Sequence, residues 1–212
     1  MSDRTVTSRG AYVGAPAAFE LPSKCSPSRR GDAAGRAFDL TLAVLLIAFT
    51  LPLLVAIALA VRLQDEGSII SAHQRVGRGG RLFRCLKYRI VSSEGAVTRV
   101  GDFLRQSGLD ELPQLFNVLE GKMSLVGPRP HAVAHNELYR KLICGYMIRH
   151  KVRPGISGWA QVNGLRGETD TVDKMSARVK FDIDYLNQWS IWLDIKILVR
   201  TVLLVVRDHR AY

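Results

Sequence analysis

The longest apolar stretch of the chain runs from Leu40 to Val61 and contains 22 residues without a charge. At about 1.5 Å per helical residue, it is long enough to cross a bilayer core of about 30 Å. Pro52 lies near its middle, where proline removes a backbone hydrogen bond and kinks or breaks a helix. The pattern fits three structures: a membrane span, a re-entrant hairpin that enters and leaves by one face, and a buried core helix.

Basic residues flank this run on both sides, and Lys and Arg favour the cytoplasmic side of a membrane. The flanking cations are Arg29, Arg30 and Arg36 before the run and Arg62, Arg75, Arg78, Arg81, Arg84, Lys87 and Arg89 after it. Each half of the run, about eleven residues, is roughly one leaflet deep. Since both ends carry cytoplasmic signals, the hairpin is a serious alternative to the span.

Periodicity predicts a mainly α-helical chain with one small β-hairpin, an α+β fold. The hairpin lies within residues 73–90, where Gly77, Gly79 and Gly80 supply the turn. A single helix is expected from Val172 to about Arg207. Its apolar stripe has Trp beside Lys and Arg, which suits a helix in the membrane interface as well as an ordinary core helix.

A shorter helix is expected over residues 109–120, where four apolar residues recur at a helical period. Pro113 is tolerated only in the first turn, so the helix should begin at about Leu109 to Leu112 and end before Gly121. This places Asp110 and Glu111 at its N-terminus. Two interpretations remain open: the acids cap the helix, or they carry chemistry in an ionised form.

Composition points to an anionic partner, since Lys+Arg number 30 against 19 Asp+Glu, a formal charge of +11. Nucleic acid, an anionic lipid surface and a phosphorylated substrate all fit this charge. The three cysteines form no CxxC pair, so a zinc site or a disulfide framework is not expected. His131 and His135 are four apart but lack an HExxH motif, which makes them a weak metal candidate.

Arginines near the acid pair connect the charge to a reaction. Arg105 precedes Asp110 by five residues, and Arg129 lies between two prolines. Arginine can bond two phosphate oxygens with its planar fork, and adjacent carboxylates can hold Mg²⁺ together with substrate phosphates. An acid nucleophile, a second acid for the metal and arginines for the charge describe phosphoryl transfer.

Four stretches of the chain together resemble the bacterial sugar transferase family, the monotopic polyprenyl-phosphate hexose-1-phosphate transferases that initiate exopolysaccharide and glycan synthesis. They are "RVGRGGRLFRCLKYR", "LDELPQLFNVLEGKMSLVGPRP", "RPGISGWAQVNGLRGET" and "FDIDYLNQWSIWLDIKIL". The resemblance covers most of the chain from Phe38 to Thr201. It implies transfer of hexose 1-phosphate, glucose or galactose, from a UDP-hexose to undecaprenyl phosphate with release of UMP.

The resemblance also implies roles for individual residues. Asp110 is expected to form a covalent aspartyl phosphosugar intermediate, and Glu111 to help hold Mg²⁺. Arg105 and Arg129 match the family's phosphate-binding arginines. The other residues of the matched stretches that we expect to bind substrate or phosphate are Lys87, Arg89 and Arg153.

Composition and the resemblance together predict a division of the chain. Residues 1–35, which lack an apolar period, are expected to form a disordered tail. Residues 36–63 are expected to form a re-entrant membrane helix broken at Pro52, and residues 64–212 a compact cytoplasmic catalytic domain with a C-terminal interfacial helix. The expected location is the cytoplasmic face of the bacterial inner membrane, and a homodimer is one assembly to test. Nucleic acid is not an expected partner, although a membrane-anchored basic module without catalysis is the alternative function.

Overall fold

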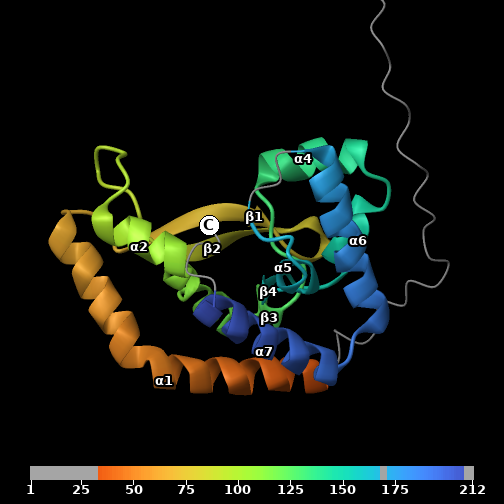
Figure 1. The fold of residues 1–212 in the computed structure, drawn as a ribbon, viewed down its shortest axis with the longest axis horizontal. Helices are drawn as coiled ribbons and strands as arrows, with labels where there is room; N and C mark the ends of the chain where they lie inside the picture. Colours follow the sequence, from red (N-terminus) through yellow and green to blue (C-terminus); the bar gives the residue numbers. More distant parts are fainter. Residues whose placement is uncertain (1–32, 168–170, 208–212) are drawn as a thin grey trace, which may run out of the picture.

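A computed structural model of the chain describes residues 33–167 and 171–207. In Figure 1 one long bent helix borders the molecule, and the remaining helices enclose two small sheets. The fold is therefore mainly helical with a small antiparallel hairpin, as the sequence predicts. The expected tail over residues 1–35 falls mostly outside the described residues, and its last three residues belong to the first helix.

Helix α1 (Ala33–Gln64) is continuous through Pro52, so the expected helix-break-helix is a bend rather than an interruption. Figure 1 shows α1 running along the base of the molecule, turning, and rising toward α2. Thr50 Oγ1 donates to Leu46 O at 2.7 Å in the turn before the proline. Because α1 bends, its two halves contact different parts of the protein.

The first half of α1 is attached to the centre of the fold by polar contacts at its buried side. The Asp39 carboxylate accepts hydrogen bonds from Ser124 Oγ at 2.6 and 2.8 Å and from Leu125 N at 3.1 Å. Arg36 donates to Val118 O and Leu119 O at 2.7 and 3.0 Å. In the second half, Tyr88 Oη donates to Leu54 O at 2.8 Å.

The outward side of α1 is apolar and exposed. Phe49 and Leu63 are both 86% exposed, and only 17% of the most apolar 18-residue window of the helix is buried. This argues against the buried core helix, because a core helix would hide that side. By length and composition α1 could cross a membrane, and an apolar face left outside the protein fits membrane association.

The expected hairpin forms between β1 (Ile70–Val76) and β2 (Leu82–Tyr88), which pair antiparallel. Its turn is the 3₁₀ segment η2 (Arg78–Gly80), in which Gly79 and Gly80 have φ of 65° and 76°. Glycine adopts this region without the Cβ clash that other residues meet. The sequence did not predict a second, parallel sheet, formed by β3 (Ser124–Val126) and β4 (Gly155–Ser157).

The remaining helices surround these sheets. They are α2 (Arg99–Ser107), α3 (Gln114–Leu119), α4 (Val133–Leu142), α5 (Trp159–Val162), α6 (Val172–Gln188) and α7 (Ile191–Arg207), with 3₁₀ turns η3 (Leu109–Glu111) and η4 (Tyr146–Lys151). Thus the predicted single C-terminal helix is wrong, because the chain leaves the helix at Trp189 (φ −54°, ψ 132°). Ser190 Oγ then accepts from Leu193 N at 3.1 Å and starts a new helix.

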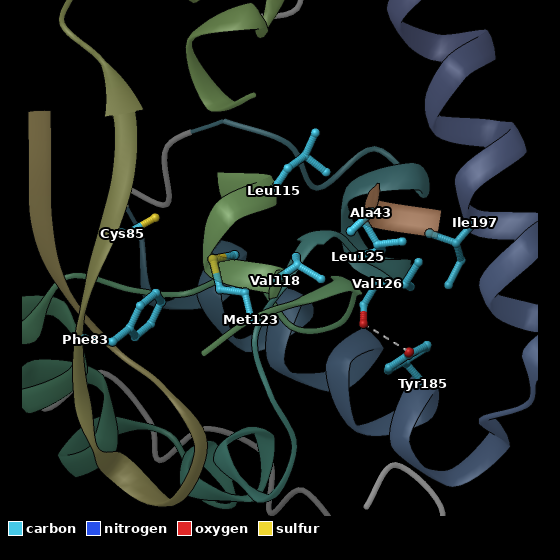
Figure 2. Close-up of a cluster of buried hydrophobic side chains, with 10 residues drawn as sticks. All are labelled: Ala43, Phe83, Cys85, Leu115, Val118, Met123, Leu125, Val126, Tyr185 and Ile197. Atoms are coloured by element: carbon cyan, nitrogen blue, oxygen red, sulfur yellow. Dashed lines mark hydrogen bonds between the residues drawn. The ribbon is translucent and has the colours of Figure 1, made fainter. Parts of the chain in front are cut away.

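The central apolar cluster joins segments far apart in the chain (Figure 2). Ala43 of α1 and Ile197 of α7 contribute to it, together with residues from β2, α3, β3 and α6. Tyr185 on α6 donates to Asp194 Oδ1 at 2.6 Å, and Trp189 Nε1 donates to Asp194 Oδ2 at 3.0 Å. Asp194 therefore fixes the angle between α6 and α7, and α7 lies across the first half of α1.

Candidate active site

The two adjacent acids lie in a 3₁₀ turn rather than at the N-terminus of an α-helix. Pro113 has no N–H to donate to Leu109 O, so the chain instead closes successive i→i+3 turns. Leu112 N donates to Leu109 O at 3.2 Å, and Leu115 N donates to Leu112 O at 3.1 Å. Helix α3 begins only at Gln114, which corrects the predicted start, while Gly121 (φ 79°) follows its end as predicted.

Asn117 fixes this turn against the hairpin. Its Oδ1 accepts from Leu86 N at 2.9 Å, and its Nδ2 donates to Arg84 O at 3.0 Å. The amide thus replaces a missing strand neighbour along β2 and leaves Lys87, the next residue, beside the acids. A buried Asn that satisfies two backbone groups is costly to replace, because both groups would lose their partners.

Lys87 and Arg129 neutralise the two acids. Lys87 Nζ lies 2.9 Å from Asp110 Oδ2 and 2.8 Å from Glu111 Oε1. Arg129 Nη2 lies 2.6 Å from Glu111 Oε1, and its Nη1 lies 3.3 Å from Oε2. Asp110 and Glu111 are only 5% and 8% exposed. Two buried like charges side by side need such partners to stay ionised.

The acids differ in the balance of burial and charge. Burial acts to raise the pKa of Glu111, but Arg129 and Lys87 outweigh it and lower this pKa to about 2. Burial, opposed by Lys87 and assisted by the Glu111 charge, raises the pKa of Asp110 above its ordinary value. Glu111 is therefore a permanent carboxylate, whereas the ionisation of Asp110 depends on Lys87.

A polar cavity of about 430 Å³ opens beside these acids. Its lining includes Glu111, the two cations that bind it, and further residues that were not among the predicted substrate-binding residues. These further residues are Arg75, Cys85, Gln114, Pro130, His131, His135, Gly167 and Arg178. The cavity is therefore rich in cations and suits a ligand with several negative charges.

A second cavity, an apolar groove of about 260 Å³, also has Glu111 in its lining. It is lined by Leu46 and Thr50 of α1, by Leu198 and Val202 of α7, and by Glu111. Val202 is 62% exposed. Glu111 thus belongs to both cavities, and the groove lies between the two helices with exposed apolar surfaces.

The structure brings four of the predicted site residues together: Lys87, Asp110, Glu111 and Arg129. The other three lie elsewhere, and their substrate binding stays a prediction. Arg105 is 3.6 Å from Asp102 on the exposed side of α2. Arg89 bonds Asp65 at 2.9 Å, and Arg153 donates to Gly121 O at 2.9 Å in a separate basic cavity.

A buried ion pair holds the Pro-Arg-Pro segment, residues 128–130, in place. Arg149 Nη2 lies 2.8 Å from Asp182 Oδ2, and both side chains are 2% exposed. The same Nη2 donates to Arg129 O at 2.7 Å, while Nη1 contacts the ring of His131. Burial and the adjacent Arg149 keep the pKa of His131 well below its usual range, so the ring is neutral. This pair therefore fixes the backbone on both sides of Pro130.

The sequence contains a signal that Asp182 is a buried charge, although it does not identify Arg149 as the partner. Arg178 and Asp182 lie four residues apart on the apolar stripe of α6, beside Met175, Val179 and Ile183. Charges on an apolar stripe are buried, and buried charges require partners.

Comparison with known proteins agrees with this geometry. A sequence profile described as "Bacterial sugar transferase" matches residues 31–208. The UDP-glucose:undecaprenyl-phosphate glucose-1-phosphate transferase of Escherichia coli (strain K12) is 50% identical over 190 residues, which are 84% of this chain and 41% of that protein. The transferase of the same name from Caulobacter vibrioides is 45% identical over 194 residues, 85% of this chain and 73% of that protein.

A third relative differs in its sugar. The UDP-N-acetylgalactosamine-undecaprenyl-phosphate N-acetylgalactosaminephosphotransferase of Aeromonas hydrophila is 39% identical over 189 residues, 83% of this chain and 44% of that protein. The chain thus spans about two fifths of the length of several of these relatives, including those from E. coli and A. hydrophila.

The buried pair gives a stability prediction. Asp182→Asn leaves the Arg149 charge buried without its carboxylate, and we expect a loss of about 3–5 kcal/mol in the free energy of unfolding. The double variant Arg149→Met/Asp182→Leu removes both charges, and it should lose less than the sum of the two single changes. Denaturant unfolding followed by circular dichroism measures each variant.

The exposed pair of Arg140 and Glu137, 2.7 Å apart, provides the control. Glu137→Gln should change stability by no more than about 0.5 kcal/mol. Strictly additive losses for Arg149 and Asp182 would contradict the assignment of a coupled buried pair.

Proposed function

The chain belongs to the bacterial sugar transferase family, and on this premise we propose that it transfers a hexose 1-phosphate from a UDP-hexose to undecaprenyl phosphate and releases UMP. Relatives named as transferases of glucose phosphate, at 43 to 50% identity, favour glucose as the hexose over galactose. The observation that carries the proposal is the position of Glu111 at both cavities. A cation-rich cavity suits the diphosphate of the donor, and an apolar groove suits the chain of a lipid acceptor.

The proposed reaction has two displacements at one phosphorus. A carboxylate oxygen of Asp110 attacks the phosphorus that bears the sugar, and the bond from that phosphorus to the bridging oxygen breaks, so UMP leaves with the electron pair. A phosphate oxygen of the lipid then attacks the same phosphorus. The Asp110 carboxylate leaves, and the sugar diphosphate lipid is the product. Neither displacement needs an oxidant or a base stronger than these oxyanions.

Cations of the site would stabilise the charge on the transferred group. Arg129 can bond two phosphate oxygens with its fork, and Lys87 lies within reach of both acids. Arg149 and Asp182 act through Arg129 by fixing its backbone, so they are positioning residues.

Magnesium fits this arrangement as a proposed cofactor. The described residues contain no group of three or more His, Cys, Asp or Glu side chains that could hold a metal ion. Mg²⁺ commonly takes one or two carboxylates from the protein and its other ligands from water and substrate phosphates. The ionised Glu111, beside Asp110, supplies such carboxylates. When bound there, the ion would neutralise charge on the phosphates.

The assay that tests the reaction follows UMP release by the detergent-purified chain with UDP-glucose, undecaprenyl phosphate and MgCl₂. Asp110→Asn keeps the size of the side chain but removes the nucleophilic oxygen anion, so release should fall by at least about a thousandfold. EDTA should abolish release by the wild-type chain. Normal release by a folded Asp110→Asn variant would exclude Asp110 as nucleophile. Absence of release by the wild-type chain, with salt-sensitive binding to nucleic acid or anionic vesicles, would support the non-catalytic basic module instead.

The pH dependence of the reaction should reflect the coupling between Lys87 and Asp110. Asp110 attacks only when ionised, so the rate falls as pH drops through its pKa, which lies above the ordinary value. Lys87 lowers this pKa, and Lys87→Met should therefore raise it and move the acid limb of kcat/KM to higher pH. UMP release measured across pH tests this shift. Lys141→Met, an exposed change on α4, is the control; an unmoved acid limb in Lys87→Met would contradict the coupling.

For the location of the chain, we propose the cytoplasmic face of the bacterial inner membrane, with α1 as a re-entrant hairpin bent at Pro52. The bend, the exposed apolar side and the basic residues on both flanks support this topology. Helix α7 has an exposed apolar side that suits the membrane interface, including Trp192 at 79% exposure. A homodimer stays a prediction.

Labelling of single cysteines distinguishes the hairpin from a span. In a chain with Cys25, Cys85 and Cys144 replaced by alanine, Ser26→Cys and Gln74→Cys should both react with a membrane-impermeant maleimide only from the cytoplasmic side. Leu45→Cys, on the exposed side of α1, should be protected from the same reagent in intact membranes. Reaction of the first two positions from opposite sides would establish a span.

A further inference from the structure

Arg178 is a buried cation that the proposed reaction has not used. It lies on α6, is 4% exposed, and contributes to the lining of the polar cavity. Burial lowers its pKa to about 10, assisted by the nearby Arg129 charge, so the guanidinium is charged at neutral pH. A buried charge is costly to keep unless something compensates it.

The bonds of Arg178 within the protein leave this charge incompletely compensated. Nη2 donates to Leu165 O at 3.0 Å and to Gly167 O at 2.8 Å, and both acceptors are neutral carbonyls. Nε is buried and has no hydrogen-bond partner among residues 33–167 and 171–207. Asp182, one turn further along α6, is bonded to Arg149. A buried guanidinium with an unused donor beside a cavity is suited to bind an anion there.

The other charges of the polar cavity also favour an anionic ligand. Glu111 is the carboxylate of the lining, and its two oxygens are already engaged by Lys87 and Arg129. The charges of Arg75 and Arg178 therefore exceed the negative charge that the described lining offers. Neutralising two such cations takes a ligand with at least two negative charges, such as a diphosphate.

Arg178 also holds the segment that separates the two cavities. Gly167 lines the polar cavity, and the preceding residue, Arg166, lines the apolar groove. The two carbonyls that accept from Arg178 belong to the residues on either side of Arg166. Gly164 and Gly167 have φ of 88° and 84°, so the turn depends on glycine and on these two bonds.

We propose that Arg178 binds the diphosphate of the nucleotide sugar and, through Leu165 O and Gly167 O, positions the segment that separates the donor cavity from the acceptor groove. This inference rests on the proposed function, because it assigns the donor to the polar cavity. Arg178 would then both contact the donor and hold one wall of the acceptor groove.

Binding of UDP and of uridine to the full chain, measured by ligand-observed NMR with MgCl₂, tests the phosphate contact. Arg178→Gln should weaken UDP binding by roughly 10- to 100-fold, the range for a hydrogen bond to a charged group. Uridine binding should be unchanged, because it has no phosphate. Arg178→Lys keeps the charge without the fork, so its affinity for UDP should lie between those of the wild type and Arg178→Gln. Arg140→Gln on α4 is the control and should bind both ligands as the wild type does.

Trypsin tests the positioning role, because it cleaves after Arg166. Loss of the two carbonyl bonds should make this cleavage faster in Arg178→Gln than in the wild type or in Arg140→Gln, as mapped by mass spectrometry. If Arg178→Gln fails to fold, Arg178→Lys, which retains the charge, carries both measurements.

The outcomes separate the inference from the proposed function. Wild-type affinity for UDP in the folded Arg178 variants would overturn the phosphate contact, and so would an equal loss of UDP and uridine binding. An unchanged cleavage rate after Arg166 would overturn the positioning role. A wild-type chain that neither binds UDP nor releases UMP from UDP-glucose would instead overturn the proposed function.

Discussion

The architecture around the site follows from one electrostatic constraint, the burial of two adjacent carboxylates. Asp110 and Glu111 are almost fully covered, and two neighbouring buried anions are stable only if cations reach them. Lys87 comes from the hairpin and Arg129 from the loop after β3, so these separate segments must meet at the acid turn. Asn117 joins α3 to β2 and so fixes the distance between Lys87 and the acids. Arg149, held by Asp182, fixes the segment of Arg129 in turn.

The same constraint explains why the acids differ, and the sequence had suggested another cause. The sequence predicts these acids at the N-terminus of an α-helix, where the helix dipole favours negative charge. Pro113 instead forces a 3₁₀ turn before α3, so α3 begins only after the acids, at Gln114. Direct contacts with Lys87 and Arg129 take the place of the helix dipole, and they act unequally. Among the described residues, both cations bond Glu111, whereas Lys87 is the cation that bonds Asp110. The more weakly compensated acid is the one proposed as nucleophile.

Features encoded by neighbouring residues could be predicted from the sequence. The hairpin and the glycine after α3 each depend on a few consecutive residues, and each is found at the expected place. Pro52 lies inside a continuous but bent helix rather than at the expected break. Contacts between distant segments could not be predicted. The β3–β4 sheet pairs two strands of three residues, too short to show a period, and the Arg149–Asp182 pair joins residues 33 positions apart. Arg105 is expected at the site from its spacing to Asp110 and from the family resemblance. Its side chain lies against Asp102 on α2, and its substrate binding stays a prediction.

The shared position of Glu111 connects the charge constraint to the membrane. A polar donor and a lipid acceptor cannot occupy one pocket, since the first needs cations and the second needs apolar walls. The bend of α1 lets its first half form one wall of the apolar groove, with α7 opposite, while its second half packs near α2 and β2. The groove therefore ends at the acid turn. On the proposed reaction, donor and acceptor therefore approach from separate cavities whose linings share Glu111. Lys87 stays beside both acids and keeps Asp110 ionised for its attack on the phosphorus.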